Sequence, residues 1–226
     1  MMWKCIALVA SGSIDLLVGF WVFSKNYKSR LRLSFLLLTV TLFIWCFANG
    51  LQEYYTFLHQ LPQALFWFRM TYVAALLITP TLVYFSYYAP LELPLDTRLR
   101  RFLWIPILLA VFLLINPNFI ITGVQVAPWG LDATYNIFGY TIFSLCLLFF
   151  MGLAFFILIK RYLFSDGVIK KALGYILFGL SLGSAFGVVF DLILPSGGYW
   201  KLNSFGAIFT LFLVFSIVYL ILHKER

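Results

Sequence analysis

The chain is dominated by seven apolar runs separated by more polar connections. Each run reaches, or comes close to, the ~20 residues that an α-helix needs to cross ~30 Å of hydrocarbon. The runs lie at residues 5–23, 33–52, 64–87, 102–116, 136–159, 172–194 and 202–222. The fourth run is the shortest, and we expect residues 119–121 to be a candidate extension of it. The pattern predicts an all-α polytopic membrane protein, a bundle of seven transmembrane helices.

The composition leaves no room for a soluble domain between these runs. Hydrophobic residues make up 63% of the chain and charged residues only 11%, whereas soluble domains average ~45–50% apolar and ~25% charged. No connection is longer than about twenty residues, too short to form its own core. Lys4 and the apolar run behind it resemble a signal peptide, but no small-x-small cleavage site follows Phe23. We therefore expect one multi-pass domain, residues 1–226, in the cell membrane.

The net charge of +8 comes from Lys and Arg residues that gather on alternate connections. Thirteen of them lie on one predicted side of the membrane, within residues 25–32, 98–101, 160–171 and 224–226. The other side carries three, which are Lys4, Arg69 and Lys201. Because basic connections stay in the cytoplasm, this bias predicts that the N-terminus is outside and the C-terminus is cytoplasmic. Charges arranged in this way set topology, so nucleic acid is not an expected partner.

The connection at residues 116–135 lies on the predicted outer side and differs from the short basic connections. It contains Pro128 and Gly130, and Val124 and Val126 alternate with polar or small neighbours. Such alternation is typical of a short β-hairpin, and long connections of this kind often act as lids. We expect this segment to lie across the outer mouth of the bundle.

An acidic residue, Asp15, lies near the middle of the first run. Gly12 and Gly19 share its helix face, because residues at i, i+3 and i+7 fall on one side of a helix. Small residues on that face let a neighbouring helix approach closely. An intramembrane acid is a functional candidate by default, but a protonated or hydrogen-bonded packing residue fits the same pattern. The sequence leaves both interpretations of Asp15 open.

Small residues at steps of four mark the sixth run. Gly179, Gly183 and Gly187 form a doubled small-xxx-small pattern, which favours close contact between helix backbones. The contact fits either another helix of the same bundle or a second copy of the chain, so a homodimer is one expected arrangement. Ser184, Gly187 and Asp191 share nearly one stripe, which predicts that Asp191 faces protein.

Polar and charged residues also gather toward the predicted outer ends of the helices. We call this set, with Trp67 beside it, the outer charge cluster, and it consists of Asn49, Glu53, Trp67, Arg69, Tyr72, Asp191 and Lys201. A guanidinium that faces lipid costs at least ~2.5 kcal/mol, so Arg69 needs an acid or water. Glu53 ends the preceding run at the same predicted face and is the expected partner of Arg69, with Asp191 as a competing acid. The cluster is either a structural set of ion pairs or the wall of a ligand pocket that opens outward.

Signals of enzymatic activity are missing from the sequence. It has no Gly-rich phosphate loop, no Ser-centred elbow with a downstream His, and no two His residues at metal-binding spacing. Cys5, Cys46 and Cys146 all lie inside apolar runs, so we expect packing residues and no disulfide framework. The sequence therefore predicts no catalytic residues, no metal and no cofactor.

An ordered set of aromatic and polar residues resembles a known family. The set comprises Trp45, Asn49, Glu53, residues 65–69, Tyr72, Pro80, Phe85, Tyr88, and residues 128–130, 160–162 and 191–195. It resembles the seven-transmembrane N-terminal sensor region of bacterial and archaeal histidine kinases, which also precedes diguanylate cyclases. The resemblance covers nearly the whole chain. It marks as important Glu53, Trp67, Arg69, Tyr72, Pro80 and Asp191.

The resemblance implies a signal-input domain that passes an extracellular or membrane signal through its last helix to a cytoplasmic kinase or cyclase. The chain stops at Arg226 before any such effector, which is therefore expected in a separate protein or in a longer form of this one. Other expected partners are the lipid bilayer and a small or lipophilic ligand of unknown identity. The alternative is a small transporter that uses Asp15 and the outer charge cluster, although no internal repeat supports it.

Overall fold

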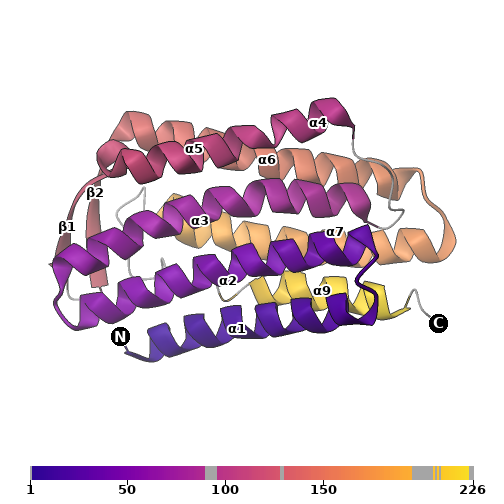
Figure 1. Cartoon of the computed structure of the whole chain (residues 1–226), viewed down its shortest axis with the longest axis horizontal. Helices are drawn as coiled ribbons and strands as arrows, with labels where there is room; N and C mark the ends of the chain where they lie inside the picture. Colours follow the sequence, from indigo (N-terminus) through magenta and orange to yellow (C-terminus); the bar gives the residue numbers. More distant parts are fainter. Residues whose placement is uncertain are drawn as a thin grey trace.

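The computed structural model describes residues 2–89, 96–127, 130–194, 206, 208 and 210–223. Its long helices run side by side along the longest axis of the molecule (Figure 1). The helices are α1 (Met2–Lys25), α2 (Arg30–Phe57), α3 (Leu61–Tyr88), α4 (Thr97–Phe102), α5 (Trp104–Ile115), α6 (Ile137–Leu163), α7 (Gly167–Gly187) and α9 (Thr210–His223). A 3₁₀ turn, η1 (Pro117–Phe119), follows α5, and a π-helical segment, η2 (Val188–Ile193), continues α7.

The helices agree with the predicted runs. Among the described residues, α1, α2, α3, α6 and α7 with the start of η2 are each long and apolar enough to cross a membrane. The fourth run corresponds to α5, with α4 just before it, and α9 covers the described part of the seventh run. The expected extension of the fourth run through residues 119–121 is wrong, because α5 ends at Ile115. Pro117 explains the end, since a proline disfavours helical geometry in the residue before it.

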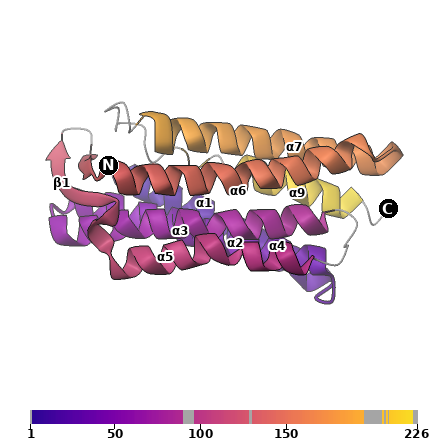
Figure 2. The ribbon, with the colours of Figure 1, turned by 90° about the horizontal axis from the view of Figure 1, so that it is seen from above.

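The long helices close into a ring. Going around the ring, α1 packs on α2, α2 on α3, α3 on α6, α6 on α7, α7 on α9, and α9 packs on α1. The remaining long segment, α5, packs on α3 from outside this ring, and Figure 2 shows α3 between α6 and α5. The arrangement places the inner faces of several helices around one interior space, which matters for the site described below.

Local sequence sets where the helices begin. The hydroxyl of Ser29 accepts a hydrogen bond from the Arg32 amide at 3.3 Å, and α2 starts one residue after it. Asn136 accepts from the Phe138 amide at 3.1 Å before α6. Such residues are favoured at helix starts because their side-chain oxygens satisfy amides that have no partner within the helix. Pro80 lies buried inside α3, where it removes one backbone hydrogen bond without ending the helix.

The predicted hairpin is confirmed. Strands β1 (Ile121–Ala127) and β2 (Gly130–Tyr135) pair antiparallel, with Val124 opposite Ala133. Ile121 in β1 is 1% exposed, and the strands contact α3 and α2. We call this end of the bundle, formed by β1, β2 and the turn between α2 and α3, the hairpin end (Figure 1).

The basic connections that are described lie at the end of the bundle opposite the hairpin end. These are residues 25–32 between α1 and α2, residues 98–101 in α4, and residues 160–171 between α6 and α7 (Figure 1). The alternation on which the predicted orientation depends is thus present in the fold. Which end faces the cytoplasm stays a prediction from the charge bias.

Candidate functional site

The two charges that the sequence paired, Arg69 and Glu53, have different partners. Arg69 donates from Nη2 to the side-chain oxygen of Asn118 at 2.5 Å and to the carbonyl oxygen of Ile121 at 3.1 Å. These acceptors belong to η1 and β1, so Arg69 ties the start of α3 to the hairpin. Neutral oxygens accept from Nη2 in place of an acid, whereas Nε is buried without a hydrogen bond among the described residues.

Glu53 lies instead beside the first helix. Its Oε1 is 4.0 Å from Nζ of Lys4, and Glu53 is 6% exposed. This contact joins the hairpin end of α2 to the start of α1. The predicted pair of Glu53 with Arg69 is therefore wrong, because each side chain contacts a different neighbour.

Aromatic residues of the third helix fill the space beside the hairpin. The hydroxyl oxygens of Tyr72 and Tyr135 are 2.5 Å apart, joined by a hydrogen bond. The ring of Tyr72 also lies edge-on to Phe143 of α6, with 4.9 Å between the centroids. Trp67 packs edge-on against Phe47 of α2, at 6.1 Å between the centroids.

Two members of the outer charge cluster lie beyond what the structure describes. Asp191 belongs to η2, but its side chain is outside the described part of the chain, and so is the whole of Lys201. Their membership of the cluster therefore stays a prediction.

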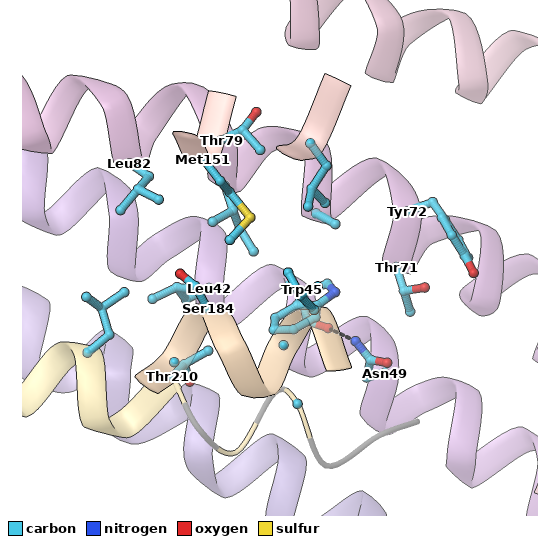
Figure 3. A pocket seen from close by; sticks show the side chains of 18 of the residues that line it. Leu42, Trp45, Asn49, Thr71, Tyr72, Thr79, Leu82, Met151, Ser184 and Thr210 are labelled. Atoms are coloured by element: carbon cyan, nitrogen blue, oxygen red, sulfur yellow. Dashed lines mark hydrogen bonds between the residues drawn. The ribbon is translucent and has the colours of Figure 1, made fainter. Parts of the chain in front are cut away.

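A cavity of about 140 Å³ lies inside the ring, between α2, α3, α6, α7 and α9 (Figure 3). Its polar lining residues are Asn49, Thr71, Tyr72, Thr79, Ser184 and Thr210, and most of the others are apolar. Of the described residues that line it, none is acidic or basic. Asn49 and Tyr72 of the predicted outer charge cluster thus line the cavity, whereas Glu53, Trp67 and Arg69 are not among its lining residues.

The predicted glycine stripe on α7 has two different surroundings. A Cβ added at Gly179 would lie 2.2 Å from Oγ of Ser216, so this glycine allows α7 to touch α9 of the same chain. Gly183 and Gly187 line the cavity, and a Cβ added at Gly187 would meet nothing within 4 Å. The described contacts of Gly179 are therefore within the bundle, while Gly187 leaves open space in the cavity wall.

Three polar side chains of the lining donate a hydrogen bond to a carbonyl of their own helix. Thr71 donates its hydroxyl proton to the carbonyl of Phe68 at 2.7 Å, and Thr79 does the same to Leu76 at 2.9 Å. Asn49 donates from Nδ2 to the carbonyl of Trp45 at 2.9 Å, as the dashed line in Figure 3 shows. Since a carbonyl only accepts, the Asn49 nitrogen is the atom that faces Trp45, and its side-chain oxygen stays an acceptor.

Asp15 is fully buried and joins the first helix to the last. Its Oδ2 accepts a hydrogen bond from Oγ1 of Thr210 at 2.7 Å. Gly12 and Gly19 on the same helix allow the close approach of α2, because a Cβ at either would lie under 3 Å from α2 side chains. Asp15 does not line the cavity but Thr210 does.

Sequence reasoning missed most of the cavity residues. Thr71, Ala75 and Thr79 repeat at intervals of four on α3, and all line the cavity. This stripe of small and polar residues within an apolar run indicates a helix face turned toward protein, and it is the feature from which these cavity residues could have been predicted. The sequence places Ser184 on one stripe with Gly187 and Asp191, whereas Thr210 carries no comparable pattern.

Comparison with known families gives one result for this chain. The family described as the N-terminal 7TM region of histidine kinase matches residues 7–222. A comparison with curated proteins gave no match. Together with the membrane-length helices, the family match confirms a bundle of seven transmembrane helices in a membrane sensor.

Proposed function

We propose a signal-relay function from one premise: the chain belongs to the family of N-terminal seven-transmembrane regions of histidine kinases. Membership makes it a membrane sensor input region, with the catalytic part of the kinase outside this region. The further step in our proposal is the route of the signal. An extracellular or membrane signal changes the position of α9, which transmits the change to a cytoplasmic kinase or cyclase, in the same polypeptide or a separate one.

The observation that carries this proposal is the set of contacts made by α9. Thr210 at its start bonds to Asp15 of α1, and Ser216 lies against Gly179 of α7. Thr210 and Leu213 also line the cavity. The last helix therefore contacts two neighbouring helices and an interior space, so a change in any of them reaches it directly.

A signal can move α9 only if it changes the relative free energies of two positions of that helix. A ligand shifts an equilibrium between two positions of α9 only as far as it binds them with different affinity. A contact that exists in one position and is lost in the other supplies that difference. We propose that the hydrogen bond between Asp15 and Thr210 is such a contact, because it holds α9 to another helix, α1.

A chimera tests the proposal. The chain is fused through α9 to the catalytic region of a histidine kinase, and autophosphorylation is measured in membranes. Inserting one to four residues after α9 rotates the attached helix by about 100° per residue. We expect kinase output to change with one or two inserted residues and to return near the starting value with four.

A point variant gives an independent test of the route. Thr210→Val keeps the side-chain shape but removes the bond to Asp15, and we expect altered kinase output. Thr141→Val on α6 is the matched control, since the exposed Thr141 bonds only to its own helix at Ile137. Output that is indifferent both to the inserted residues and to Thr210→Val would contradict the proposal.

A further inference from the structure

We infer that the cavity inside the ring binds a small, uncharged, mainly apolar cyclic molecule, between benzene and indole in size, that carries a hydrogen-bond donor. Phenols, indoles and cyclic alcohols are members of this class. The claim that such a molecule is the signal rests on the proposed sensory function, whereas the claim that it binds does not. The arguments are size, charge, wall chemistry and the direction of the hydrogen bonds.

Size sets the upper limit for the ligand. The cavity measures about 140 Å³, and a cavity of roughly 150 Å³ lined by apolar side chains admits benzene. Aromatic rings of Trp45, Phe68, Tyr72 and Phe143 contribute to the wall. Aromatic rings attract one another in edge-to-face and offset geometries, so a flat ring fits this wall better than a flexible chain does.

Charge is excluded by the lining. The described residues around the cavity include no acid or base, and an ion moved into such surroundings loses its hydration without gaining a partner.

Access from the lipid phase suits the same class of molecule. From Ser181 to Phe190, every described residue of α7 and η2 is at least partly exposed, and Ser184 and Gly187 of this stretch also line the cavity.

The hydrogen-bond pattern favours a donor. The protons of Thr71 and Thr79 are engaged with carbonyls of their own helix, which leaves oxygen lone pairs for a ligand. Asn49 is 4% exposed, one proton of its Nδ2 is donated to Trp45, and its side-chain oxygen stays an acceptor. A ligand with O–H or N–H satisfies these acceptors. A ligand that only accepts leaves them unpaired in an apolar environment, which is costly.

Matched pairs of probes test the ligand class on the full chain in lipid nanodiscs. The pairs are phenol with anisole, indole with 1-methylindole, and cyclohexanol with methoxycyclohexane. Each pair differs by methylation of the donor. Calorimetric titration against empty nanodiscs separates binding from partition into lipid. We expect saturable binding of at least one donor, and at least ~10-fold weaker binding of its methylated partner.

Two variants locate the binding to the cavity. Gly187→Leu fills the cavity from a position where an added Cβ meets nothing, and we expect it to abolish saturable binding. Gly152→Leu is the matched control, because Gly152 on α6 is equally unobstructed but exposed and outside the cavity. Asn49→Leu is expected to weaken binding of the donor probe and to reduce the difference in affinity between that probe and its methylated partner.

The outcomes separate the ligand class from the sensory function. Equal affinity within every pair, or no saturable binding by any donor, would overturn the ligand class even if Thr210→Val alters the output of the chimera. Donor binding that Gly187→Leu abolishes and Gly152→Leu preserves would support it. The same binding without any change in kinase output at saturation would support the ligand class and overturn its role as the signal.

Discussion

Thr210 donates a hydrogen bond to Asp15 at 2.7 Å, although 195 positions separate them in the chain. The bond joins the last described helix to the first and closes the ring. Asp15 is 0% exposed and Thr210 is 7% exposed, so water does not replace this bond when it is lost.

Removing the donor is expected to destabilise the bundle. Thr210→Val leaves Asp15 Oδ2 without that donor, and leaving a buried acceptor unpaired costs ~1–3 kcal/mol. Asp15→Asn keeps an oxygen that accepts from Thr210 and should cost less. Thermal unfolding in detergent measures both, with Thr141→Val as the neutral control. An unfolding midpoint of Thr210→Val equal to that of the control would show that the bond contributes nothing.

Arg69 should be coupled energetically to Asn118 and not to Glu53. Replacing Arg69 by Leu removes its bonds to η1 and β1, and hydrogen bonds to charged groups contribute ~1.5–3 kcal/mol. The double change with Asn118→Leu should cost less than the sum of the two single changes. Arg69→Leu with Glu53→Gln should be additive within ~0.5 kcal/mol.

Hydrogen exchange in the hairpin offers a second measurement for Arg69. Without the arginine, amides of β1 should exchange faster while those in the centre of α2 stay protected. Coupling to Glu53 in place of Asn118 would contradict the assignment and restore the pairing that the sequence favoured.

Gly179 should tolerate no larger side chain. Gly179→Leu places atoms where Ser216 Oγ and the Phe212 carbonyl already lie, 2.2 and 3.0 Å from the new Cβ. Overpacking of this kind costs ~1–3 kcal/mol, so the melting temperature in detergent should fall. Gly152→Leu should leave it unchanged. A variant that melts normally but has lost a dimer would show that the stripe serves contacts between chains.

The orientation can be tested with reporters that work only in the cytoplasm. A reporter inserted within residues 26–29 or fused after Arg226 should be active, and one inserted within the hairpin should be silent. The basis is the gathering of basic residues at one end of the fold. Activity from the hairpin position, together with silence at the other two, would reverse the bundle in the membrane.

The elements were predictable from the sequence because apolar length and alternation are local properties. The alternation around Val124 predicted the hairpin. Pro117 explains why α5 stops at Ile115, because a proline disfavours helical geometry in the residue before it. The partner of Arg69 was not predictable in this way. Spacing gives the height of a residue along its helix, whereas its neighbour depends on how each helix is rotated within the ring.

The cavity was even less accessible to sequence reasoning. It is lined by single residues or short stripes from separate helices, such as Asn49 on α2 and Ser184 on α7. No local pattern reports that these faces meet. The glycine stripe illustrates the same limit, since one repeating pattern contains a contact with α9 at Gly179 and open space at Gly187.

The π-helical segment at Val188–Ile193 has a consequence for chain length. A π turn accommodates one residue more than an α-helical turn does, so the step of four that runs from Gly179 to Gly187 does not continue in phase to Asp191. Deleting one residue from this segment should convert it to regular α-helix without breaking it. Everything before the deletion would keep its contacts, and everything after it would keep nearly the same direction, because the wider turn absorbs the extra residue. The segment therefore gives α7 one additional residue without redirecting the chain that follows.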